Sequence, residues 1–132
     1  MLPGVESWIF AAKQRGFKLG VASSSTSEWV EPHLIRLGLR EEFDCLRCAD
    51  HVKRAKPDPE LYVSVLAGLG VEAQEAVAIE DSPNGIMAAK RAGVFCIAVP
   101  NSVTTSLDLS QADLRLSSLA DLSLEGFLAQ AQ

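Results

Sequence analysis

Short apolar runs alternate with longer amphipathic segments along the chain, and glycine or proline stands at most of the junctions. The runs have the length of buried strands, whereas the segments between them are long enough for helices. This alternation is typical of βαβ units and predicts an α/β fold with a mostly parallel sheet. The expected strands are 17–22, 43–48, 76–79, 94–99 and a weaker one at 112–116.

Turn and capping residues predict where the helices begin. Ser25 and Glu28 have the spacing of a capping box. Asp58 and Ser82 each precede a proline, which is the arrangement of an N-cap followed by proline at the first helical position. Pro32 lies inside the expected helix 26–37, where it would either kink the helix or mark its true first turn. The expected helices are 3–14, 26–37, one that opens at Pro59, 83–92 and 119–130.

Composition fits one folded domain. The chain has 132 residues, of which 48% are hydrophobic and 22% charged, so it is too apolar for a disordered protein. The net charge is −5, and the densest basic stretch is only Lys53, Arg54 and Lys56. We therefore expect neither nucleic acid nor an anionic membrane as a partner.

The cysteines and the first residues of the chain indicate the cellular compartment. Three cysteines without framework spacing indicate free thiols in a reducing compartment. No apolar run approaches the roughly 20 residues that span a bilayer, and the first residues do not resemble a signal peptide. We expect a cytoplasmic protein.

Polar residues at the predicted strand ends are the first candidates for chemistry. In an open α/β sheet, ligands bind beyond the carboxyl ends of the strands. Ser23 ends the first strand, Lys56 lies in a loop before a helix, and Glu80 and Asp81 end the third strand. A hydroxyl, a cation and two carboxylates at one edge suit a phosphoryl group held beside a divalent cation such as Mg²⁺.

Each candidate also has a structural interpretation. Ser25 favours a helix cap over a ligand, and Ser23 fits a turn hydroxyl as well as a phosphate contact. Lys56 alone would be a solvated loop charge. Glu80 and Asp81 are harder to explain structurally, because adjacent acids repel one another unless a cation joins them. Order and spacing together favour the functional interpretation.

The cysteines, histidines and tryptophans are expected to have structural rather than catalytic roles. Cys45 and Cys48 form a single C-x-x-C pair whose members would point to opposite faces of a strand, which argues against zinc or redox chemistry. Cys96 is expected in the core, and His33 and His51 on the surface or in a loop. Both tryptophans, Trp8 and Trp29, are expected to pack against the sheet.

Three segments together resemble the motifs of a known family. The segments are 19–25 (LGVASSS), 56–60 (KPDPE) and 79–85 (IEDSPNG), the last followed by Ala-Ala at 88–89 and Ala-Gly at 92–93. They look like motifs two, three and four of the haloacid dehalogenase superfamily, in its phosphoglycolate phosphatase and β-phosphoglucomutase branch. The resemblance runs from residue 2 to about residue 100. It implies a Rossmann-like core and a Mg²⁺-dependent phosphatase or phosphomutase that acts on a small phosphorylated metabolite.

The resemblance also implies residue roles. Ser23 would hydrogen-bond the transferring phosphoryl group, with Ser24 adding backbone contact. Lys56 would stabilise the phosphorylated intermediate, and Asp81 with Glu80 would help to hold Mg²⁺. Asn84 and Gly85 would shape the turn below the metal.

One family feature is missing from these residues. Family members begin with a central strand ending in Asp-x-Asp-Gly, whose first aspartate is the nucleophile, and no Asp-x-Asp occurs in the 132 residues. The helical cap domain is missing too. We therefore expect this chain to be inactive alone, and either to pair the two strands that flank the missing one or to expose an apolar slot and self-associate.

Two other functions compete with an enzyme core. A non-catalytic module could use Ser23, Lys56 and Asp81 to bind phosphate or metal for regulation. A response-regulator receiver domain has a similar length, but its first strand is followed by an acidic pair, whereas the first strand here ends in serines.

Overall fold

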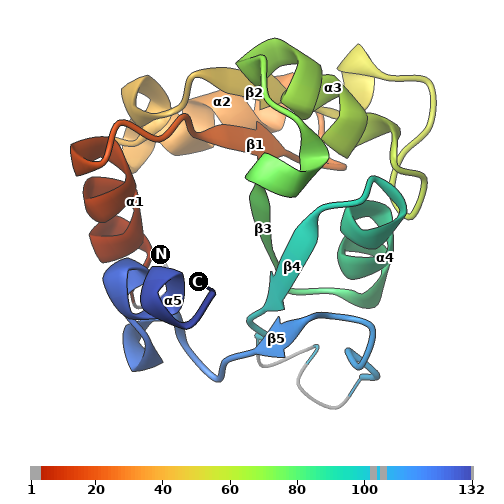
Figure 1. Ribbon diagram of the computed structural model, residues 1–132. Coiled ribbons are helices and arrows are strands. Elements are labelled where there is room, and N and C mark those ends of the chain that lie inside the picture. Colours follow the sequence, from red (N-terminus) through yellow and green to blue (C-terminus); the bar gives the residue numbers. More distant parts are fainter. Residues whose placement is uncertain (1–3, 102–103, 105–106, 132) are drawn as a thin grey trace.

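Five parallel strands form two separate sheets in the computed structural model, which describes residues 4–101, 104 and 107–131 (Figure 1). One sheet pairs β1 (Gly20–Ala22) with β2 (Cys45–Arg47). The other has the order β3-β4-β5, with β3 (Val77–Glu80), β4 (Phe95–Ala98) and β5 (Leu114–Arg115). The predicted α/β class and parallel arrangement are confirmed. Within the described residues no pairing joins β1 to β3, so the strands expected to flank a missing one do not pair directly.

Four of the five described strands are shorter than predicted, whereas β3 keeps its predicted length and begins one residue later. The run 17–22 gives a strand only over Gly20–Ala22, and 43–48 only over Cys45–Arg47. Among the described strands, β1 and β2 pair only with each other. A residue can therefore join either strand only where the two segments run side by side and form hydrogen bonds. The expected last strand is present but spans just Leu114–Arg115.

Five α-helices occupy the predicted segments: α1 (Val5–Gln14), α2 (Ser27–Arg36), α3 (Glu60–Leu69), α4 (Pro83–Arg91) and α5 (Leu124–Ala131), all within the described ranges. Ser82 caps α4 as predicted, since its Oγ accepts the Gly85 N–H at 3.2 Å. Helix α3 begins one residue later than predicted, although Asp58 Oδ1 accepts the Glu60 N–H at 3.0 Å. The expected helix 119–130 is broken into a 3-10 turn at Leu119–Asp121 and then α5.

Helices cover the sheets from two sides. Helix α3 packs on β1 and β2, and α4 on β3 and β4, while α1 and α5 contact one another across the other face. Trp8 anchors that second face, because its indole N–H lies 3.0 Å from the Leu119 carbonyl oxygen and 2.9 Å from that of Leu122. Trp8 is buried as predicted, but the prediction for Trp29 is wrong: it is 60% exposed and stacks on His33 with ring centroids 5.0 Å apart.

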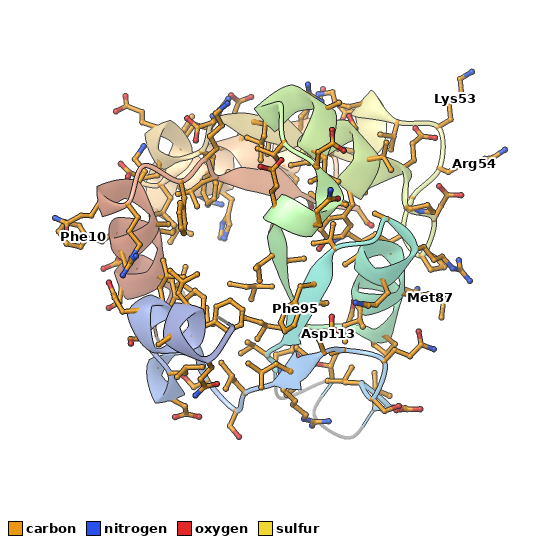
Figure 2. The ribbon with its side chains drawn as sticks, viewed as in Figure 1. Phe10, Lys53, Arg54, Met87, Phe95 and Asp113 are labelled. Carbon is orange, nitrogen blue, oxygen red and sulfur yellow. The ribbon has the colours of Figure 1, made fainter. Side chains whose placement is uncertain are left out.

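Apolar side chains remain exposed on β3, whose other neighbour would be β1, and on the central strand β4. Val77 and Ile79 on β3 are 45% and 42% exposed, and Phe95 on β4 is 39% exposed. Figure 2 shows Phe95 projecting from β4 toward α5, where its ring lies 5.6 Å from that of Phe127. The sequence predicted either direct pairing of β1 with β3 or an exposed apolar slot between them. Among the described residues, the structure has the slot.

None of the helices that the structure describes combines the length and the apolar character needed to cross a membrane.

Candidate active site

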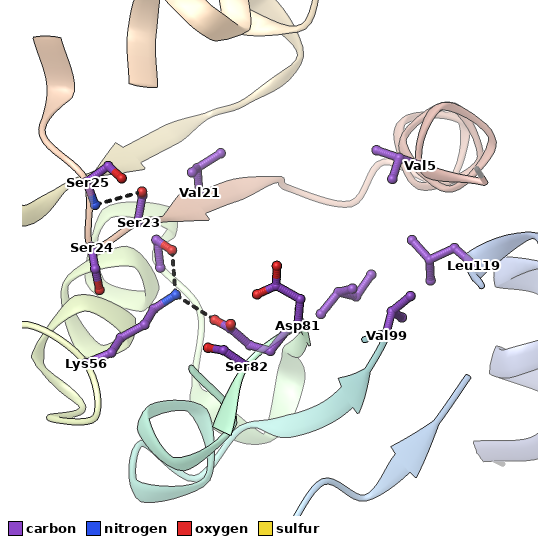
Figure 3. Close-up of a pocket in the computed structure, with 13 residues that line it drawn as sticks. Val5, Val21, Ser23, Ser24, Ser25, Lys56, Asp81, Ser82, Val99 and Leu119 are labelled. Carbon is purple, nitrogen blue, oxygen red and sulfur yellow. Dashed lines mark hydrogen bonds and ion pairs between the residues drawn. The ribbon is translucent and has the colours of Figure 1, made fainter. Parts of the chain in front are cut away.

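A cavity of about 560 Å³ opens at the carboxyl ends of β1 and β3 (Figure 3). It lies in the slot between the two sheets and joins segments that are far apart in the sequence. The residues predicted to bind the phosphoryl group or the metal all contribute to its wall, whereas Asn84 and Gly85 do not line it. The lining residues are Val5, Val21, Ala22, Ser23, Ser24, Ser25, Lys56, Ile79, Glu80, Asp81, Ser82, Val99 and Leu119.

The serine loop leaves β1 at the mouth of this cavity. The Ser23 N–H continues the sheet by donating to the Arg47 carbonyl oxygen at 3.0 Å. The Ser23 Oγ accepts the Ser25 N–H at 3.1 Å, which tightens the loop. A hydroxyl that accepts one hydrogen bond still has its proton to donate. Ser23 can therefore be both the local turn residue and an anion contact, the two interpretations that the sequence left open.

Helix α2 is capped by a residue that the sequence did not indicate. The predicted capping by Ser25 is wrong, because Thr26 occupies the N-cap position and makes no side-chain capping bond. Instead, Asp50 accepts the Ser27 N–H at 2.9 Å and the Ser27 hydroxyl at 2.5 Å. The Ser27 hydroxyl and backbone bonds hold the pKa of Asp50 below its usual value. The cap comes from 23 residues away, so local spacing could not reveal it.

Lys56 is a largely buried contact rather than a solvated loop charge. Its side chain is 12% exposed, and its Nζ lies 2.6 Å from Glu80 Oε2. The same Nζ donates to the Ala22 carbonyl oxygen at 2.9 Å and lies 5.3 Å from the centre of the Tyr62 ring. Lys56 thus joins the end of β1 to the end of β3, and Figure 3 shows both contacts.

Glu80 points inward and is held on several sides. The residue is 7% exposed, and its Oε2 accepts hydrogen bonds from both Lys56 and the Tyr62 hydroxyl. A Cβ at Gly85 would overlap Glu80 Oε1, so only glycine fits there without displacing the carboxylate. Burial and the nearby Glu80 charge raise the pKa of Tyr62, which keeps its phenol protonated and donating.

Asp81 is exposed and faces the cavity. Its Oδ2 accepts a hydrogen bond from Asn101 Nδ2 at 3.1 Å. The donor set at this position consists of oxygens, which Mg²⁺ prefers, and Asp81 is the acid whose carboxylate fits such a cation directly. Glu80 Oε2 is engaged by Lys56 and Tyr62, so a direct metal contact from Glu80 stays a prediction.

Sequence reasoning missed Tyr62 and Asn101. A signal existed for Tyr62, because a tyrosine within a mostly apolar helix that packs on a sheet needs a partner for its hydroxyl. Asn101 gave no signal, since it lies 20 residues from Asp81 in a mostly polar stretch of sequence.

Cys48, Asp50 and His51 offer ligand atoms within 4.8 Å of one another. Contacts within the fold account for them, because Asp50 caps α2 and His51 Nδ1 accepts the Cys48 N–H at 2.9 Å. Burial, followed by the charge of Asp50, raises the pKa of the Cys48 thiol and disfavours the thiolate that a metal needs. We assign no metal to this group.

The remaining cysteines are core residues. Cys45 packs with Val65 and Leu69, whereas Cys48 packs with Val30 in a different cluster, as expected for side chains on opposite faces of a strand. Cys96 is fully buried, as predicted, and burial raises the pKa of its thiol to about 12.

Comparisons with known proteins agree with this geometry. The family described as haloacid dehalogenase-like hydrolase matches residues 1–99. YhcW of Bacillus subtilis (strain 168) is 48% identical over 122 residues, which cover 92% of this chain and 56% of YhcW. Validoxylamine A 7'-phosphate phosphatase of Streptomyces hygroscopicus subsp. limoneus is 38% identical over 122 residues, 90% of this chain and 55% of that enzyme.

A solved structure matches the fold closely. The crystal structure of CbbY from Rhodobacter sphaeroides in complex with phosphate superposes with a TM-score of 0.90 at 39% identity, over 95% of this chain and 57% of CbbY. The chain spans little more than half the length of each of these relatives. The resemblance inferred from the three sequence motifs is confirmed, and the chain belongs to the haloacid dehalogenase-like hydrolase family.

Proposed function

We propose that these residues form the larger part of a Mg²⁺-dependent phosphatase or phosphomutase site for a small phosphorylated metabolite. The convergence of Ser23, Lys56 and Asp81 on one cavity carries the proposal. Relatives support the substrate class, since one is named as a phosphatase of validoxylamine A 7'-phosphate and CbbY was crystallised with phosphate.

Ser23 and Lys56 would bind the phosphoryl oxygens. The Ser23 hydroxyl accepts the Ser25 N–H and can direct its own proton into the cavity. Two of the three N–H groups of the Lys56 ammonium donate to Ala22 and Glu80, so the third can donate to a phosphoryl oxygen. A preorganised cation at this position would stabilise the charge that develops during transfer.

Asp81 would hold the metal next to these donors. A bound Mg²⁺ would supply Lewis-acid stabilisation of the phosphoryl oxygens. Glu80 keeps the Lys56 ammonium at the cavity wall through their 2.6 Å ion pair, and its carboxylate would add negative charge next to Asp81.

The phosphoryl acceptor would come from outside these residues. The family uses an aspartate of an Asp-x-Asp strand, and the 132 residues contain no such pair. The slot between β1 and β3, with Val77 and Ile79 exposed beside it, suits an extended apolar segment that pairs with both strands. The chain by itself would therefore bind phosphate without turning over a phosphate ester.

A second candidate is a non-catalytic phosphate- or metal-binding module. The observation that favours it is that Ser23, Lys56 and Asp81 line the cavity, whereas the 132 residues contain no Asp-x-Asp pair.

Two measurements on the purified chain test the proposal. Titration calorimetry with inorganic phosphate should show binding that Ser23→Ala weakens, and that Lys56→Met weakens at a temperature where thermal unfolding shows this variant to be folded. Ser110→Ala, a serine outside the cavity, is the control. Hydrolysis of p-nitrophenyl phosphate with Mg²⁺ should not exceed that of Asp81→Ala. Phosphate binding unaffected by Ser23→Ala and Lys56→Met would refute the anion site. Mg²⁺-dependent turnover that Asp81→Ala abolishes would refute the expected inactivity and show that another carboxylate acts as acceptor.

A further inference from the structure

We propose that Asn101 is a positioning residue for Asp81 and that Thr104 fixes the Asn101 amide for this task. The inference rests on the proposed function, because it gives Asn101 a role only if Asp81 holds the cation. Asp81 directly follows β3 and Asn101 follows β4 by a few residues. Since Glu80 pairs with Ala98 in the parallel register, the two strands deliver these side chains to the same edge of the sheet.

Thr104 determines which way the Asn101 amide faces. Asn101 Oδ1 accepts hydrogen bonds from the Thr104 N–H at 2.9 Å and the Thr104 hydroxyl at 3.1 Å. The Thr104 Oγ1 in turn accepts the Asn101 N–H at 3.0 Å. A backbone N–H can only donate, so the amide atom that faces it must be the oxygen. The Nδ2 group is thereby directed at Asp81 Oδ2, 3.1 Å away.

This contact would preorganise the Asp81 carboxylate without cancelling its charge. A donor fixed on Oδ2 restricts the rotation of the carboxylate and leaves Oδ1 for a cation in the cavity. A neutral amide is suited to this role, because a lysine at position 101 would form an ion pair with Asp81 and compete with the metal. The site already has a lysine, Lys56, but its ammonium is paired with Glu80.

Binding of Mn²⁺ to the purified chain, followed by the electron paramagnetic resonance signal of the free ion, tests the inference. Mn²⁺ takes the same oxygen ligands as Mg²⁺. Asn101→Ala should weaken Mn²⁺ binding about tenfold, at the low end of what the loss of an outer-shell partner costs. Thr104→Val, which removes the hydroxyl but keeps the shape, should weaken binding less, and Thr104→Ser should retain it. Gln111→Ala, which removes an exposed amide from the same segment, is the matched control.

The outcomes separate the inference from the proposed function. Asn101→Ala should have no further effect on Mn²⁺ affinity in an Asp81→Ala background. Wild-type affinity in Asn101→Ala, together with lost affinity in Asp81→Ala, would overturn the positioning role and leave the metal site standing. A chain that binds no Mn²⁺, or binds it equally well after Asp81→Ala, would overturn both. Thermal unfolding of each variant checks that a lost affinity does not reflect a lost fold.

Discussion

Lys56 and Glu80, 24 residues apart in the sequence, form a 2.6 Å ion pair whose side chains are only 12% and 7% exposed. The pair joins the loop before α3 to the end of β3. Because both side chains are largely removed from water, each charge depends on the other for compensation.

Removing one member of this pair should destabilise the chain strongly. Among the described residues, Lys56→Met leaves the buried Glu80 carboxylate with only the Tyr62 hydroxyl as a side-chain partner, and breaking such a buried pair costs about 3–5 kcal/mol of unfolding free energy. The double variant Lys56→Met/Glu80→Gln should lose less than the sum of the single variants, because it leaves no uncompensated charge. Urea unfolding of the four proteins measures this coupling, and additive losses would show that the pair is solvated in solution.

Gly85→Ala should also destabilise the chain, although alanine is the better helix former. The new Cβ would overlap Glu80 Oε1, so the carboxylate must move away from Lys56 and Tyr62. We expect a loss of about 1–3 kcal/mol, typical of overpacking. Gly126→Ala in α5 is the control, because its Cβ would meet only side-chain atoms of Leu122 and Ser123, the nearest at 3.1 Å. Unfolding of Gly85→Ala at the wild-type urea midpoint would mean that Glu80 has another low-energy position.

The order of the elements was predictable because its signals are local. Ser82 caps α4 as the sequence indicated, and Gly16 and Gly38 adopt the left-handed φ of 75° and 73° that ends a helix. The convergence of Ser23 and Asp81 was predictable for a different reason, since parallel strands present their carboxyl ends at one edge.

The missed contacts are long-range and depend on the packed fold. Asp50 caps α2 only because β2 brings its loop beside the start of that helix. Tyr62 reaches Glu80 because α3 packs on β1 and β2 with that side chain directed at the end of β3. Trp29 was misplaced because α2 has an aromatic residue on its exposed side, which periodicity in a single helix does not distinguish from its packed side.

Acid should remove the contribution of Asp113 to stability. Partial burial acts to raise its pKa, but the hydrogen bonds from Lys90 at 2.6 Å and the Cys96 N–H at 2.8 Å prevail and hold that pKa below 3.8. A carboxyl group whose pKa is lower in the folded state stabilises the fold above its unfolded pKa. This stability is lost as the pH falls through the folded pKa.

Asp113→Asn should therefore be less stable than the wild type at pH 7, and the difference should shrink as the pH falls below about 4. Urea unfolding across this range measures it. Lys90→Met is the matched control, because without the ammonium the folded pKa of Asp113 should rise and the acid dependence should weaken. A difference that stays constant from neutral to acid pH would mean that Asp113 is not held by these bonds in solution.

The exposed slot should make the isolated chain self-associate. The facing edges of β1 and β3 have no strand between them in the described residues, and Val77 is 45% exposed beside that opening. Unpaired strand edges next to apolar side chains promote pairing between chains. We expect light scattering coupled to size exclusion to give a mass that rises with protein concentration.

Val77→Lys should reduce this association, because a charged side chain at the slot opposes edge-to-edge pairing. Val63→Lys is the matched control: it makes the same exchange at a 53% exposed valine on α3. If both variants reduce association equally, net charge rather than the slot controls it. A wild-type chain that stays monomeric at all concentrations would mean that the slot is closed by the chain itself.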